Sequence, residues 1–115
     1  MVKRLERMAM LFDFYGKLLT DKQQEMLAFY YEQDLSLGEI AEEFQISRQA
    51  VHDVIKRSEK ILEQYEEKLG LVNKFNIEQE KLNELLQLLE NLEVRSGTAQ
   101  SIKKIVYEIQ EISDI

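Results

Sequence analysis

The stretch that decides the fold spans residues 36–57 and reads SLGEIAEEFQISRQAVHDVIKR. Ser36 is placed to cap a first helix, and Glu39 three residues later completes a capping box. Ser47 is placed to cap a second helix. The small side chain of Ala41 allows the two helices to cross closely at the short turn between them. This spacing predicts a helix-turn-helix whose second helix presents its first turns to solvent.

One face of the second helix carries the residues expected to contact nucleic acid: Arg48, Gln49, His52, Lys56, Arg57 and Lys60. The first three lie within a turn and a half of the helix start, where arginine suits guanine and glutamine suits adenine. The last three lie farther along and suit phosphates. Two features oppose this interpretation. Gln45 occupies a turn position often held by glycine, and the first helix carries the acidic side chains of Glu39, Glu42 and Glu43.

The sequence before and after the motif also predicts helices. Apolar residues at spacings of three and four predict a helix over residues 2–19. Thr20 and Gln23 form a second capping box, which starts a helix over residues 21–33. The helix that ends the motif is expected to continue until Gly70, where a left-handed residue would end it.

These helices are expected to form a helix-turn-helix domain over residues 1–70, followed by a helical hairpin over residues 71–115. Asn76 is the expected cap of a helix over residues 77–94, and Ser96-Gly97-Thr98 is the expected loop. Each hairpin helix carries one aliphatic stripe at heptad spacing: Leu82, Leu85, Leu89 and Leu92 on one, and Ile102, Ile105, Ile109 and Ile112 on the other.

The two stripes have three alternative uses. They can face each other within the chain, form the seam of a dimer, or form a groove for a partner. Helix-turn-helix proteins commonly pair two recognition helices on DNA. We therefore expect a homodimer and regard the hairpin as its dimerisation element, or else as a partner-binding element.

Composition excludes several classes of protein. The chain has 115 residues, no cysteine, no proline and a single histidine, His52. Disulfides, thiolate zinc sites and multi-histidine metal sites are therefore impossible. No constellation of acid, base and nucleophile can be assembled, so we expect no enzyme activity. No apolar run is long enough for a membrane span. The stretch after the basic N-terminus is broken by Asp13 and Lys17, which makes a poor signal peptide, so we expect a cytoplasmic all-α protein. The net charge of −7 argues against non-specific nucleic-acid binding.

The chain resembles the YlxM-like family of small bacterial helix-turn-helix proteins, in which the motif is similar to region four of sigma factors. The resemblance covers about residues 1–75 and rests on these segments: MAMLFDFYG at 8–16, LLT at 18–20, Gln23, Tyr30-Tyr31, LSLGEIA at 35–41 and SRQAVHD at 47–53. It implies DNA binding, no enzyme activity and no cofactor. The genes of the family lie beside those for the signal recognition particle GTPase and its receptor, which implies a role in that targeting pathway.

Two functions therefore remain in view. The first is a non-enzymatic regulator that binds DNA, or RNA, through the face of the second motif helix. The second is an adaptor that binds the signal recognition particle GTPase or its RNA without reading DNA. The net charge of −7 would assist encounter with that basic machinery.

Overall fold

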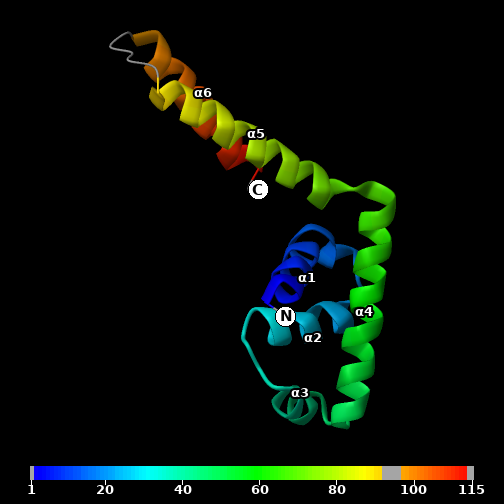
Figure 1. Cartoon of the computed structure of the whole chain (residues 1–115). Coiled ribbons are helices and arrows are strands. Elements are labelled where there is room, and N and C mark those ends of the chain that lie inside the picture. Colours follow the sequence, from blue (N-terminus) through cyan, green and yellow to red (C-terminus); the bar gives the residue numbers. More distant parts are fainter. Residues whose placement is uncertain (1, 92–96, 114–115) are drawn as a thin grey trace. The chain divides into compact units, whose positions relative to one another are not determined.

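The computed structural model describes residues 2–91 and 97–113 (Figure 1), and these are helical apart from short connections. The elements are α1 (Val2–Tyr15), the 3-10 helix η1 (Gly16–Leu18), α2 (Asp21–Tyr31), α3 (Leu37–Phe44), α4 (Arg48–Leu69), α5 (Leu71–Asn91) and α6 (Gly97–Ser113). The predicted all-α class is therefore confirmed. The chain forms two compact units, Met1–Val72 and Asn73–Ile115.

Three of the four helix starts predicted from capping residues, those after Thr20, Ser36 and Ser47, are correct. Thr20 and Ser36 each accept a hydrogen bond from the backbone three residues on, and each capping box is complete. The Ser47 hydroxyl accepts from the amide of Ala50 at 3.0 Å. Gly70 ends α4 with a left-handed backbone at φ 61°. These helix boundaries depend on contacts between residues within one helical turn, so they could be predicted from the sequence alone.

The first two predicted helices were too long. α1 ends at Tyr15, and the chain tightens into η1 before Leu19. A Cβ atom at Gly16 would lie 2.9 Å from the ring of Phe12, so any other residue here would force that ring to shift. α2 ends at Tyr31 instead of residue 33, and Asp34 then adopts a left-handed backbone at φ 57°.

The core of the first unit lies along α4, which contacts α1, α2 and α3 (Figure 1). Its fully buried side chains come from all four helices: Leu11, Tyr15, Met26, Leu27, Ile40, Val51 and Leu62. Burying a large aliphatic side chain stabilises a fold by about 1.5–3 kcal/mol. Because these contacts hold α4 along much of its length, its outer face is presented on a rigid support.

A buried polar cluster joins the two ends of the first unit. The hydroxyl of Tyr15 donates to Oε1 of Glu66 at 2.6 Å and accepts from the amide of Leu71 at 3.1 Å. The amide of Val72 donates to the same carboxylate oxygen at 3.0 Å. The expected cap at Asn76 was therefore wrong. α5 starts at Leu71, because Tyr15 and Glu66 already bind its first amides.

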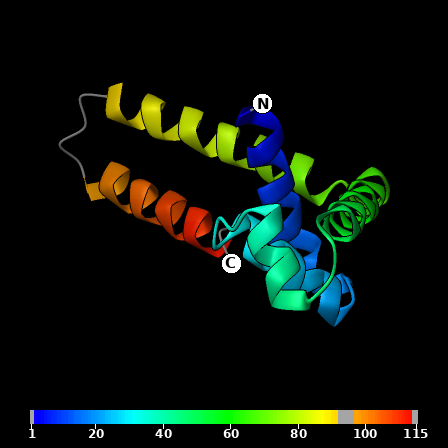
Figure 2. The ribbon, with the colours of Figure 1, turned by 90° about the horizontal axis from the view of Figure 1, so that it is seen from below.

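In the second unit α5 and α6 lie side by side as a hairpin (Figures 1 and 2). Residues 92–96 lie outside the described part, so the predictions for Leu92 and for the helix end at 94 lie outside it too. Gly97 and Thr98, expected in the loop, belong to α6. Asn83 and Gln110 join the two helices through a hydrogen bond of 3.0 Å.

The hairpin buries a different face of α6 from the isoleucine stripe. Ala99 and Val106 are buried, whereas the stripe is exposed, at 38% for Ile102, 55% for Ile105, 42% for Ile109 and 69% for Ile112. On α5, Leu89 is buried and Leu85 is exposed. The isoleucine stripe therefore lies largely outside the contact between α5 and α6. None of the described helices is long and apolar enough to cross a membrane.

Candidate nucleic-acid interface

The helix-turn-helix is built as the sequence predicts. α3 ends at Phe44, and the residue that caps it, Gln45, has a left-handed backbone at φ 55° and ψ 46°. The following amide, of Ile46, donates to the carbonyl of Ala41 at 3.1 Å, which closes the end of α3. Buried Ile40 and Val51 lock the two helices together. The departure noted at Gln45 is therefore a real left-handed turn made without glycine.

Arg48, Gln49 and His52, in the first turns of α4, are all exposed. Their side chains differ in the contacts that they make within the chain. Arg48 lies against α3, where a Cβ atom at Gly38 would come within 2.9 Å of Nη2. Gln49 donates to Oδ1 of Asp53 at 3.0 Å, and Nδ1 of His52 lies 3.7 Å from the same oxygen. Asp53 thus fixes the side chain of Gln49 and places a negative charge beside His52.

Lys56 belongs to a separate cluster on the α1 side of α4. Its Nζ lies 3.6 Å from Glu59, a buried carboxylate that also contacts Arg4 at 3.3 Å. The hydroxyl of Tyr31 donates to the other oxygen of Glu59. Burial and this hydrogen bond raise the pKa of Tyr31 above its ordinary value. The two positive charges of Lys56 and Arg4 outnumber the one negative charge of Glu59, so the cluster keeps a net positive charge.

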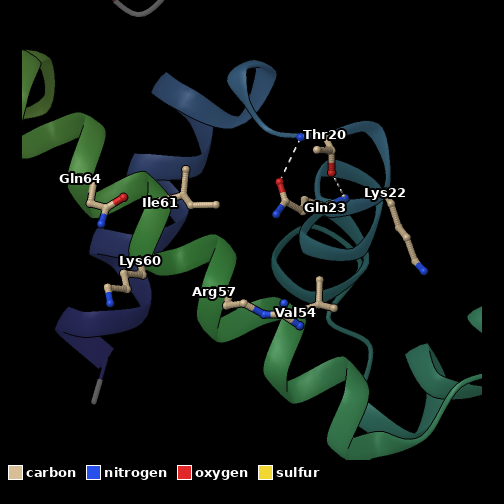
Figure 3. Close-up of a pocket in the computed structure, with 8 residues that line it drawn as sticks. All are labelled: Thr20, Lys22, Gln23, Val54, Arg57, Lys60, Ile61 and Gln64. Atoms are coloured by element: carbon tan, nitrogen blue, oxygen red, sulfur yellow. Dashed lines mark hydrogen bonds between the residues drawn. The ribbon is translucent and has the colours of Figure 1, made fainter.

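Arg57 and Lys60 line a pocket of about 490 Å³ between α4 and the start of α2 (Figure 3). Lys22 of α2 lines it from the other side, and Val54 and Ile61 supply apolar surface. Arg57 also makes a long contact of 3.5 Å to the carbonyl of Asp53. The six predicted residues therefore lie in three places. Arg48, Gln49 and His52 lie at the start of α4, Lys56 lies beside Glu59, and Arg57 and Lys60 line this pocket.

The acidic residues of α3 have different environments. Glu39 accepts a hydrogen bond from the Ser36 amide at 3.0 Å, and hydrogen bonding to Ser36 lowers the pKa of Glu39. Its charge also favours the positive end of the α3 dipole. Glu42 and Glu43 are exposed. They leave the first motif helix acidic, as the sequence indicates.

Sequence reasoning missed two residues of this surface. Lys22 lies 35 positions before Arg57 and outside the motif, so no local spacing connects the two. Gly38 was read only as part of α3, although its bare backbone accommodates Arg48. The sequence feature that could have identified this contact is a glycine inside a short helix, which often indicates that another group packs closely against the backbone.

Comparisons with known proteins agree with this architecture. Residues 1–114 match the model of the UPF0122 family, described as "Putative helix-turn-helix protein, YlxM / p13 like". A UPF0122 protein of Desulforamulus reducens is 46% identical over 117 residues, covering 96% of this chain and 100% of the relative. Those of Halalkalibacterium halodurans and Bacillus cereus strain AH187 are 46% and 48% identical, each covering 97% of this chain and 99% of the relative. The chain therefore belongs to the YlxM/p13-like family of helix-turn-helix proteins.

Proposed function

We propose that this protein is a non-enzymatic regulator that binds duplex DNA, with the first turns of α4 in the major groove. The observation that carries the proposal is the exposed start of α4, capped by Ser47 and held against α3 at a left-handed turn. Arg48, Gln49 and His52 then face base edges, as the similarity to sigma region four implies. Lys56, Arg57 and Lys60 face phosphates.

A salt titration of binding to random duplex DNA, followed by fluorescence anisotropy, tests this proposal. Three phosphate contacts predict a slope of about −2.7 for log affinity against log salt. Arg48→Ala should weaken binding, whereas Arg7→Ala is the matched control, because Arg7 lies on α1 and pairs with Glu63 at 2.8 Å. No binding, or binding that salt does not weaken, would refute the proposal.

The second candidate is an adaptor for the signal recognition particle, through its GTPase or its RNA. The family resemblance and the net charge of −7 support it, since negative charge favours encounter with basic partners. Binding to the GTPase should then survive removal of charge at Arg48, Lys56 and Arg57. Loss of GTPase binding in those variants would count against a separate adaptor surface.

For either function we propose a homodimer formed through α6. Support comes from the four isoleucines, which keep heptad spacing and stay exposed after the hairpin has packed. Sedimentation at tens of micromolar should show a dimer. Replacing Ile105 and Ile109 together by aspartate should yield a monomer with unchanged helix content. A wild-type monomer at that concentration would reject the proposal.

A further inference from the structure

The pocket between α2 and α4 concentrates positive charge. Lys22, Arg57 and Lys60 line it, and none of the described residues that line it carries a carboxylate. Asp21, next to Lys22, is not among its lining residues. Among the described residues, no ion pair to a carboxylate involves any of these three cations. They contrast with Lys56, whose charge is shared with buried Glu59.

The neutral polar groups of the pocket do not offset this charge. The Thr20 hydroxyl oxygen accepts from the amide of Gln23 at 3.2 Å. The side-chain oxygen of Gln23 accepts from the amide of Thr20 at 3.0 Å, as the dashed lines in Figure 3 show. Both oxygens are thus engaged within the chain. The groups left to meet a ligand are the amide of Gln64 and the ammonium and guanidinium donors, and these charged donors suit an anion.

The position of the pocket favours a nucleic-acid backbone over a free nucleotide. In Figure 3, Arg57 lies between Lys60 on the same helix and Lys22 on α2. In the described part of the chain no aromatic residue lines the pocket, so these residues offer no platform on which a base could stack. Arg57 is one turn beyond Asp53, which contacts Gln49 in the first turn of α4, where base contacts are proposed. The row of cations therefore continues the proposed DNA-facing surface.

We propose that Lys22 joins Arg57 and Lys60 in binding backbone phosphates of the duplex that α4 reads. This inference rests on the proposed function and extends it to a residue outside the helix-turn-helix. A lysine contact to phosphate releases counterions and carries no sequence information. Lys22 therefore adds affinity for any duplex and adds no preference among sequences.

The test is Lys22→Gln in the full-length chain, assayed by anisotropy on two unrelated duplexes across a salt series. With Lys22 as a fourth contact, the wild-type slope becomes about −3.6, and the variant returns to about −2.7. Affinity should fall about eightfold at 0.1 M salt and about twofold at 0.5 M, equally for both duplexes. Lys22→Arg should retain most of the affinity, and Lys81→Gln on α5 is the matched single-charge control.

The outcomes separate this inference from the proposed function. If the wild type binds duplex and Lys22→Gln behaves like Lys81→Gln, the inference fails while the proposed function stands. If the wild type binds no duplex, the proposed function fails, and the inference with it. Poly-glutamate serves as a second anionic ligand. If Lys22→Gln loses binding to poly-glutamate but keeps its affinity for duplex DNA, the inference is also overturned, because the pocket would then bind an acidic protein segment.

Discussion

Tyr15→Phe tests whether the buried cluster between α1 and the end of α4 stabilises the first unit. The change removes one hydroxyl, which donates to Glu66 and accepts from the amide of Leu71. The ring itself should stay in place, because it is 1% exposed and stacks on Tyr65 with a centroid distance of 5.9 Å. The variant therefore isolates hydrogen bonding from packing.

The expected loss of stability follows from the charge of Glu66. A hydrogen bond to a charged group contributes about 1.5–3 kcal/mol, and a donor left without its partner adds a further penalty. Glu66 is 9% exposed, so water replaces the lost hydroxyl poorly. We expect a loss of about 2–3 kcal/mol, which lowers the urea midpoint by about 2 M for a unit of this size.

Near-UV circular dichroism during urea unfolding is the appropriate assay, since four of the five tyrosines lie in the first unit. Tyr65→Phe is the matched control. It removes a hydroxyl from the neighbouring ring, and no hydrogen bond of that hydroxyl is found among the described residues. In a Glu66→Gln background, Tyr15→Phe should cost only about 1 kcal/mol, because the acceptor is then neutral. Equal stability of Tyr15→Phe and Tyr65→Phe would refute the reasoning.

Three further predictions concern the turn, the tyrosines and the hairpin. Gln45→Gly should stabilise the first unit by about 0.5–1 kcal/mol in urea unfolding, because glycine relieves the left-handed strain but adds entropy to the unfolded chain; a loss would contradict this. Burial raises the pKa of Tyr15 and of Tyr31, so stability should be constant below the unfolded-state pKa near 10 and fall as pH rises above it; Phe variants should reduce that fall. Val106→Asp should unfold the hairpin, measured as lost ellipticity at 222 nm, because it buries a charge; the same change at exposed Tyr107 should be tolerated.

The parts of the fold that sequence predicts are the local ones. Thr20, Ser36 and Ser47 each specify a helix start through a contact within three residues. The start of α5 could not be predicted in this way. It depends on Tyr15, which lies 56 positions before Leu71, and no pattern along the chain connects a tyrosine with a helix start so far away.

The hairpin shows a second limit. Heptad spacing of Ile102, Ile105 and Ile109 correctly identifies one apolar face of α6. Spacing cannot say which face packs within the chain, and the structure buries the smaller Ala99 and Val106 instead. Small residues allow helices to approach closely, so the face with the larger side chains is left outside. At the candidate site, spacing along the chain likewise could not identify Lys22. The packing of α2 on α4 brings Lys22 and Arg57 to the same pocket.

The acidic balance of the chain and its proposed DNA binding are compatible on physical grounds. At physiological ionic strength the Debye length is about 8 Å, so exposed charges farther apart than this are largely screened. A phosphate in the pocket would therefore respond mainly to Lys22, Arg57 and Lys60, and only weakly to carboxylates more than about 8 Å away. The net charge of −7 still opposes long-range attraction to DNA. Lowering the salt should then strengthen binding less than the local contacts alone predict, because repulsion by the rest of the chain grows as screening weakens. A slope that flattens below about 0.05 M salt would be the signature of this balance.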